Sequence, residues 1–453
     1  MKKTLLITIS IAVVLLLSLS LSLSGCKTTG TSETTAAATQ TETTAAAETT
    51  AAETQAAGEK PNLIFWQNEA GSGLSQWYKD VAADINANED FTIEIVENPI
   101  ADVITKLTAA GVSQSGFDIT WDWSGTMSTL ARGTGGIYQP INKIVGADVL
   151  DKLSPDTRVA NTDESGNLYG APFFLETCYM AYNKQILEKA GIDVNNIPTE
   201  FNAWMDMMEK IKASGVIPIS FANKEGLVHE FWVMDMMSQY FNDTAAHKQS
   251  WMDAKFSTAP EWKDVMEKYK AMYDKKYLDP EGETLDYASN YFSRFSSGRV
   301  AAIWFINSLY ASTIKEGEIG DANVVYGKLP FMGTAALKES FPTLGYNLAV
   351  ANWTKYPEQC AIAIGYFTGE KWQKEMLKYG VVPAYQGVDI SGADITPNMQ
   401  FIYSANPKFT PMGYEYWVAS QYDELIRSAT DYLHESITFE DFAKKMEAAS
   451  VSE

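Results

Sequence analysis

Residues 62–66 read Asn-Leu-Ile-Phe-Trp and residues 117–121 read Phe-Asp-Ile-Thr-Trp, and these two short apolar stretches decide the fold. Between them, apolar residues recur at helical spacing over 74–85, alternate with polar residues over 91–95, and return to helical spacing over 103–110. The order strand, helix, strand, helix, strand is typical of parallel strands joined by right-handed crossovers. The sequence therefore predicts an α/β fold from residue 62 onward.

Both apolar stretches end in a tryptophan that polar residues follow. Trp66 precedes Asn68 and Glu69, and Trp121 precedes residues 122–124. Because ligands of parallel sheets bind beyond the carboxyl ends of the strands, we expect these side chains to share one rim. Aromatic faces stack on sugar rings, while carboxylates and amides bond hydroxyl groups. The rim has acids and no arginine fork, which favours a neutral, hydroxyl-rich ligand over a phosphate.

The first 26 residues have the pattern of an export signal. Lys2 and Lys3 precede an apolar run that starts at Leu5, and the run ends in Leu-Ser-Gly before Cys26. This ending resembles the bacterial lipobox, in which the cysteine becomes the mature N-terminus and carries a diacylglycerol. The resemblance implies a cleaved signal over 1–25 and a lipid anchor at Cys26. The alternative is an uncleaved membrane-spanning helix, because the run is nearly long enough to cross a bilayer.

The next segment, 26–60, is almost wholly Thr, Ala, Glu, Ser, Gln and Gly, with no aromatic residue. Such a composition cannot bury a core, so we expect a disordered stalk between the anchor and the folded body.

Charge and composition exclude some partners. The 453-residue chain carries a net charge of −22, which becomes −24 once Lys2 and Lys3 leave with the signal. So acidic a body should avoid nucleic acid. It is 46% hydrophobic, which is ordinary for a soluble globular protein.

Cysteine and histidine give no sign of a metal site or of a cofactor. The three histidines have no metal-ligand spacing, and no Cys-x-x-Cys pair occurs. Cys178 and Cys360 lie in apolar segments, where two buried free thiols are favoured over a disulfide, although a disulfide is permitted outside the cell.

Several motifs behind the lipobox resemble one family, the maltose-type extracellular solute-binding proteins (family 1) of ABC sugar importers. The motifs run in the family's order: GGIYQPI at 135–141, GNLYGAP at 166–172, YNK at 182–184 with AGI at 190–192, PTEF at 198–201, GVIPI at 215–219, and VPAY at 382–385. The resemblance covers nearly all of 61–453.

The resemblance implies a two-lobed periplasmic-binding-protein fold, with mixed sheets, hinge crossings and a ligand cleft between the lobes. It places the first lobe at 61–172 and 345–381, and the second at 173–343 and 384–453. Prolines 172, 342 and 383 lie near the three crossings.

Ligand-binding residues follow by motif position, and no catalytic residue is expected. Glu176, six residues before the YNK motif, matches a ligand-contacting glutamate, and Trp121 matches a strand-end aromatic. A departure occurs after residue 303, where Leu309 stands in place of a family tryptophan and Trp304 or Tyr310 could replace it. The complete set of expected contacts is Trp66, Asn68, Glu69, Trp121, Asp122, Trp123, Glu176, Glu230, Trp232, Trp304, Asn307, Tyr346, Asn347, Tyr416 and Trp417. For Glu176 a structural ion pair is the alternative, and for Trp232 helix packing.

The resulting expectation is a monomeric, lipid-anchored protein at the outer face of the cytoplasmic membrane. It would capture a carbohydrate by hinge closure and deliver it to an ABC permease. Two alternatives remain open. One is an exported glycoside hydrolase that uses an acid pair such as Glu69 and Asp122, and the other is a binder of a peptide or a polyamine, which converging acids would suit.

Overall fold

The computed structural model describes residues 60–68, 73–315, 317–404 and 406–450. Its strands are β1 (Asn62–Gln67), β2 (Thr92–Glu97), β3 (Ile119–Trp123), β4 (Ala171–Asn183), β5 (Ile217–Ile219), β6 (Val300–Ile306), β7 (Val324–Gly327), β8 (Phe341–Val350), β9 (Val382–Pro383) and β10 (Phe409–Pro411). The predicted signal 1–25, Cys26, stalk residues 26–59 and Glu69 lie outside the described residues.

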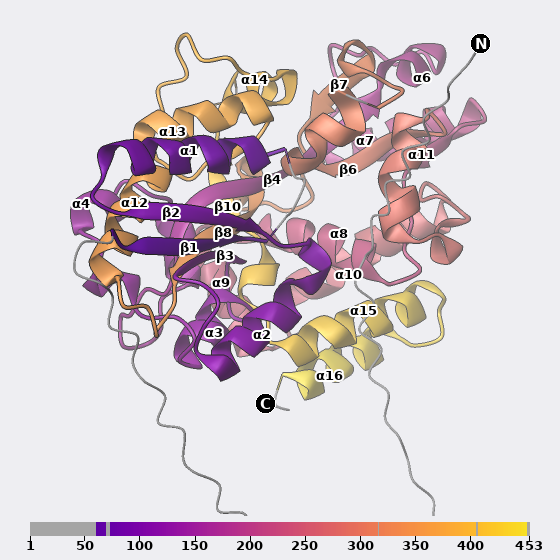
Figure 1. Cartoon of the computed structure of the whole chain (residues 1–453). Coiled ribbons are helices and arrows are strands. Elements are labelled where there is room, and N and C mark those ends of the chain that lie inside the picture. Colours follow the sequence, from indigo (N-terminus) through magenta and orange to yellow (C-terminus); the bar gives the residue numbers. More distant parts are fainter. Residues whose placement is uncertain (1–59, 69–72, 316, 405, 451–453) are drawn as a thin grey trace, which may run out of the picture.

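Sixteen α-helices occur in the described part of the chain (Figure 1). They are α1 (Ser75–Asn88), α2 (Val103–Ser113), α3 (Thr129–Thr134), α4 (Ala147–Leu150), α5 (Pro155–Ala160), α6 (Lys184–Lys189), α7 (Phe201–Ala213), α8 (Leu227–Ser238), α9 (Thr244–Asp253), α10 (Pro260–Asp274), α11 (Phe292–Ser296), α12 (Pro357–Thr368), α13 (Glu370–Glu375), α14 (Pro397–Ser404), α15 (Ala419–Leu433) and α16 (Phe439–Ala449). Three short helical turns also matter below: η4 (Tyr287–Tyr291), η5 (Asn307–Leu309) and η10 (Gly413–Glu415).

The predicted parallel unit at the start of the body is confirmed. Strand β1 pairs in parallel with β2 on one side and with β3 on the other. Helix α1 has the expected apolar spacing, because its buried residues are Trp77, Tyr78, Val81, Ala82 and Ile85. Helices α1 and α12 cover one face of these strands and α2 covers the other (Figure 1).

Strand β4 links the two halves of the molecule. The sheet order is β2-β1-β3-β8-β4-β6-β5, with β3 antiparallel to β8. Residues 171–177 of β4 pair with β8, whereas residues 178–183 pair with β6 and β7. Strand β9 pairs with β4 at Phe174 and Leu175, and β10 runs parallel to the start of β8. The fold is therefore a two-lobed α/β structure with a mixed sheet that passes through both lobes.

The buried apolar residues divide in the same way. Two clusters, built on β1–β3, α1, α2 and α12, form what we call the first lobe. A larger cluster around α7, α8, α10, β6, α15 and α16 forms the second lobe. Cys360 lies in the first lobe and Cys178 in the second, both buried and both free. The residue boundaries of the lobes stay a prediction.

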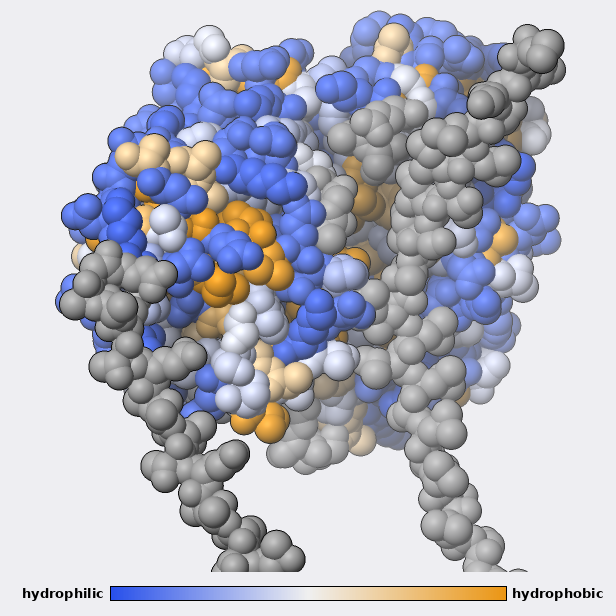
Figure 2. Space-filling model, in the orientation of Figure 1, coloured by the Kyte–Doolittle hydropathy of each residue, from blue (hydrophilic) through white to orange (hydrophobic). Residues whose placement is uncertain are grey.

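On the coloured part of the face shown in Figure 2, hydrophilic residues predominate around a smaller group of hydrophobic ones. Among the described residues, no helix combines the length and the apolar character that crossing a bilayer requires.

Candidate ligand-binding site

The ends of β1 and β3 are tied together by buried polar side chains. Asn68 is fully buried, and its Nδ2 donates to Thr120 Oγ1 and to the Trp121 carbonyl, each at 2.8 Å. Its Oδ1 accepts from Asn98. Trp66 is half-buried, and its ring packs on Phe117 with centroids 5.0 Å apart. These environments favour structural roles for Asn68 and Trp66.

Asp122 is neutralised by an arginine of the same lobe. Arg132 Nη1 lies 2.5 Å from Asp122 Oδ2, and the Tyr138 hydroxyl donates to the same oxygen at 2.9 Å. Asp122 is fully buried, and burial raises the pKa of its carboxyl although Arg132 opposes the shift. An acid that is already paired in this way has little capacity left for a ligand or for acid catalysis.

The two tryptophans of β3 differ in exposure. Trp121 is buried against Trp123, with centroids 5.4 Å apart and planes nearly perpendicular, and against Tyr346 at 5.0 Å. Trp123, at the end of the strand, is half-buried. Of these two rings, Trp123 is the one that a ligand can reach in this conformation.

Glu176 sits where β4 passes between the lobes. Its carboxyl accepts from the hydroxyl of Ser308, in η5, and from the hydroxyl of Tyr346, in β8, at 2.9 Å. It is 6% exposed, and burial raises its pKa. Asn307 holds the same part of β4, because its Oδ1 accepts from the Thr177 amide at 2.6 Å. The partners of Glu176 are hydroxyl groups, and no salt bridge involves it within the described chain.

Two neighbouring positions on β8 contribute buried groups. The Tyr346 ring stacks on Phe174, with centroids 4.1 Å apart. Asn347 is fully buried, its Nδ2 donates weakly to Thr129 at 3.5 Å, and its Oδ1 has no hydrogen-bond partner among the described residues.

Helix α8 has an acid and an aromatic residue at consecutive positions. Glu230 is 5% exposed, whereas the next residue, Phe231, is half-buried. The Phe231 ring stacks on Trp304, with centroids 4.6 Å apart and an interplanar angle of 4°. Trp304 lies behind it and donates from Nε1 to the buried Asp235. The accessible ring is therefore that of Phe231, and the buried Trp304 supports it from behind.

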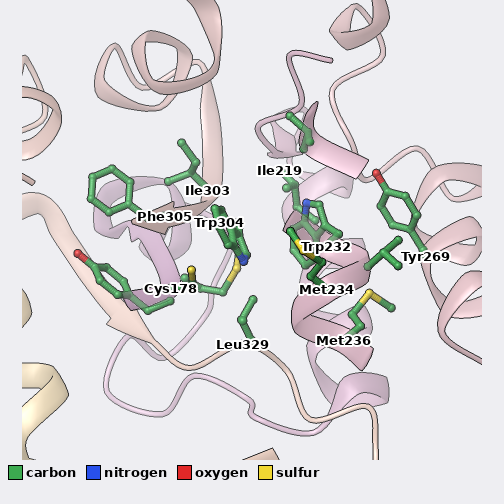
Figure 3. Packing of buried hydrophobic residues seen from close by; sticks show 14 of the residues in the cluster. Cys178, Ile219, Trp232, Met234, Met236, Tyr269, Ile303, Trp304, Phe305 and Leu329 are labelled. Carbon is green, nitrogen blue, oxygen red and sulfur yellow. The ribbon is translucent and has the colours of Figure 1, made fainter. Parts of the chain in front are cut away.

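Three other expected tryptophan and tyrosine contacts lie in the interior. Trp232 is fully buried and packs near Trp204 in the second lobe, where Figure 3 shows it among apolar side chains. Trp417 packs on Trp251 at 4.7 Å, and Tyr416 is 2% exposed. The packing interpretation is favoured for all three, because neighbouring side chains already cover them.

Four half-buried aromatic residues gather around Glu230. Tyr287 lies 5.6 Å from Phe231 between ring centroids, and Tyr414 lies 6.0 Å from Tyr422. The charge of Glu230 raises the pKa values of the Tyr287, Tyr414 and Tyr422 hydroxyls, and the charge of Glu176 raises the pKa of Tyr287. We call this group the aromatic site, and it consists of Glu176, Glu230, Phe231, Tyr287, Tyr414 and Tyr422.

The aromatic site adjoins the first lobe. Tyr414 lies near Ser128, and the charges of Asp122 and Arg132 shift the pKa of its hydroxyl in opposite directions. The neighbouring Glu415 is fully buried and accepts from Ser124 Oγ at 2.7 Å and from the Gly345 amide at 2.8 Å. The η10 turn therefore fastens the second lobe to the first beside the site.

Most residues of the aromatic site were not predicted from the sequence. Among its members only Glu176 and Glu230 were expected, whereas Phe231, Tyr287, Tyr414 and Tyr422 were not. The sequence feature that could have indicated Phe231 is its position between two expected contacts, Glu230 and Trp232. Tyr414 stands two residues before Tyr416, and no local pattern distinguishes which of the two is accessible.

Sequence comparison identifies the family. The family model described as bacterial extracellular solute-binding protein matches residues 70–374. A maltotriose-binding protein of Pyrococcus abyssi (strain GE5 / Orsay) is 29% identical over 151 residues, which is 33% of this chain and 30% of that protein's length.

Solved structures share the fold over almost their full lengths. One comes from work on xylan utilisation by Caldanaerobius polysaccharolyticus, with a TM-score of 0.71, 18% identity, and coverage of 85% of this chain and 99% of that one. A chitin oligosaccharide binding protein has a TM-score of 0.71 and 19% identity, and the match covers 87% of this chain and 98% of that one. A third is the GacH receptor of Streptomyces glaucescens, which was studied unliganded and with acarbose. It has a TM-score of 0.68 and 16% identity, and the match covers 86% of this chain and 97% of that one. From the family match, this chain belongs to the bacterial extracellular solute-binding proteins.

Proposed function

We propose that this protein is the carbohydrate-binding component of an ABC importer, held at the outer face of the cytoplasmic membrane by a lipid on Cys26. The observation that carries the proposal is the aromatic site, in which three half-buried tyrosines interact with two buried carboxyls, and the half-buried Phe231 ring packs on one of these tyrosines. Neither carboxyl has a cation partner in the described chain. It is an arrangement suited to a ligand that offers both C–H faces and hydroxyl groups.

The chemistry of the site favours a neutral sugar. Phe231, backed by Trp304, provides a flat apolar platform for a pyranose face. The carboxyl of Glu230 and the hydroxyls of Tyr287, Tyr414 and Tyr422 provide hydrogen-bonding groups around it. An anionic ligand is disfavoured, because Arg132 is already committed to Asp122.

The similar proteins support a carbohydrate rather than another solute. Their names mention maltotriose, chitin oligosaccharide and acarbose. We therefore propose a mono- or oligosaccharide ligand, bound with about −8 kcal/mol if the affinity is micromolar.

Capture would proceed by hinge closure of a monomer. Strand β4 belongs to both lobes, and β8 and β9 pair with it at the junction. A ligand that contacts Trp123 of the first lobe and Phe231 of the second would stabilise the closed form, because it binds that form better. The closed, loaded form would then deliver the sugar to the permease.

A titration tests carbohydrate binding. We would use the mature chain with Cys26→Ser, and follow tryptophan fluorescence and calorimetric heat with maltotriose, xylotriose, triacetylchitotriose and the matching monosaccharides. Saturable binding of at least one saccharide is expected. Absence of any response, or binding of spermidine or a peptide that high salt abolishes, would refute the carbohydrate proposal.

Two further measurements address the alternatives. Release of reducing ends from a bound oligosaccharide would indicate a glycoside hydrolase; we expect intact ligand, because Asp122 is already paired with Arg132. Expression of the natural chain and of Cys26→Ser tests the anchor. The natural chain should fractionate with membranes and the variant should not, whereas equal partition of the two would exclude lipidation at Cys26.

A further inference from the structure

Glu230 differs from Glu176, the other acid of the aromatic site, in its hydrogen bonding. It lies in the first turn of α8 and is 95% removed from solvent. The Tyr422 hydroxyl lies near its carboxyl and lowers its pKa, but Oε2 has no hydrogen-bond partner among the residues that the structure describes. A buried polar atom without a partner is rare in folded proteins, so this oxygen has capacity for a ligand.

The groups that face Glu230 are neutral hydroxyls, and of these only Tyr422 favours the charged carboxylate. Tyrosine hydroxyls approach from three elements: Tyr422 on α15, Tyr287 on η4 and Tyr414 on η10. Beyond Tyr287 lies Glu176, a second acid, and beyond Tyr414 lies Arg132.

Neither the neighbouring arginine nor the neighbouring histidine supplies a free positive charge. Arg132 already pairs with Asp122. His229 is also buried, and burial lowers its pKa to about 3, so the imidazole is neutral.

We propose that Glu230 holds the ligand as a neutral carboxylic acid, donating a hydrogen bond from its Oε2 to an acceptor atom of the sugar. The proposal rests on the proposed carbohydrate function and adds a specificity-determining residue to it. Its electrostatic basis is consistent with the geometry, because burial raises the pKa of Glu230 to about 8 even though Tyr422 opposes the shift.

A protonated carboxyl selects different ligands from a carboxylate. A carboxylate only accepts hydrogen bonds and would require a ligand hydroxyl or amine. A carboxylic acid can donate to an atom that has no proton of its own, such as a ring oxygen, a glycosidic oxygen or an acyl carbonyl. Glu230 would therefore favour a saccharide that presents such an oxygen beside the Phe231 platform.

The protonation state of Glu230 can be measured without any ligand. Carboxyl carbon resonances of the glutamates would be recorded by NMR in the Cys26→Ser chain, and Glu230 assigned by its loss in Glu230→Gln. The exposed Glu188 on α6, changed to Gln, serves as the matched control. A titration midpoint near 8 is expected, and a midpoint below about 5 would overturn the proposal.

Binding as a function of pH gives the second test, with maltotriose, xylotriose and triacetylchitotriose as probes. Affinity should be constant between pH 6 and 7 and should fall as pH rises, approaching tenfold per unit above 8, because the donor is lost. Glu230→Gln also donates, so it should bind within about threefold of the natural chain and lose the alkaline decline. Glu230→Ala should bind at least tenfold more weakly.

The opposite pattern would overturn the inference while leaving carbohydrate binding intact. Affinity that rises from pH 6 to 8, with Glu230→Gln as weak as Glu230→Ala, would show that Glu230 acts as a carboxylate. If none of the probes binds the natural chain, the carbohydrate function fails and the inference fails with it. Thermal unfolding of each variant at pH 7 checks that the fold is retained.

Discussion

Replacing Arg132 by methionine should destabilise the protein strongly, because it leaves Asp122 buried without its cation. Asp122 has no exposed side-chain surface, and the Arg132 side chain is 13% exposed. One Arg132 nitrogen contacts both carboxylate oxygens, at 2.7 and 2.5 Å, and only the Tyr138 hydroxyl and the Trp123 amide would remain. Breaking a buried pair by removing one partner costs about 3–5 kcal/mol.

The assay is urea unfolding followed by circular dichroism at pH 7, with Arg158→Met as the matched control. Arg158 also pairs with an aspartate, Asp151, at 2.9 Å, but that aspartate side chain is 69% exposed. Exposed pairs contribute about 0–1 kcal/mol, so the control should lose at most that much. The double variant Arg132→Met with Asp122→Leu should recover most of the lost stability, because no buried charge is left.

The pH dependence of Arg132→Met gives an independent check. Without Arg132, the pKa of folded Asp122 should rise further above its unfolded value, and the carboxyl becomes more easily protonated in the folded state. Stability tied to such a group is present at low pH and is lost as pH rises through the folded pKa. The deficit should therefore shrink toward pH 4. A loss below 1 kcal/mol at pH 7, or a double variant as unstable as the single one, would refute the reasoning.

Three other measurements follow from the structure. Phe231→Ala should weaken saccharide binding roughly ten- to thirtyfold through loss of about 1.5–2 kcal/mol of stacking, while Phe231→Tyr retains it; equal affinities would exclude the platform. Burial raises the pKa of Glu415 to about 8, so its protonated form favours folding below the unfolded pKa and that contribution disappears as pH rises to 8. The contribution of Glu415 to the unfolding free energy should accordingly fall between pH 5 and 8 by roughly 5 kcal/mol at most, so the decline should be smaller in Glu415→Gln than in the natural chain; identical pH profiles would contradict this. Cys178 and Cys360 should resist a thiol reagent in the folded protein and react in urea, and rapid labelling without denaturant would show that the burial is wrong.

Local patterns in the sequence were sufficient for the first part of the fold. Residues 62–121 alternate between helical and strand spacing, and each segment lies where that spacing predicts. The pairing of β3 with β8 could not be predicted in this way, because it joins residues 119–123 to 346–350. Strand β4 is buried at all 13 positions, so it has no alternation from which a register could be derived.

The site was harder to predict, for a similar reason. Helix α8 is buried on nearly every side, so Glu230, Phe231 and Trp232 have no amphipathic pattern that says which of them faces the site. Tryptophan was the expected stacking residue, yet Trp304 and Trp417 are buried and smaller rings are accessible. Exposure of an aromatic residue depends on which neighbours cover it, and those neighbours come from distant parts of the chain.

The long separation between β3 and β8 also affects when the protein can fold during its synthesis. Ile119 lies opposite Val350, so the sheet of the first lobe lacks its fourth strand until residue 350 has been made. At about 5–20 residues per second, a ribosome needs roughly 10–50 s to make the intervening chain. During that interval only β1, β2 and β3 can pair with one another, because β8 separates them from β4 in the sheet. Contacts between distant residues also form slowly. This delay is compatible with export, because a chain that completes its sheet late stays unfolded for longer. An unfolded chain is the form that can pass through a narrow secretion channel.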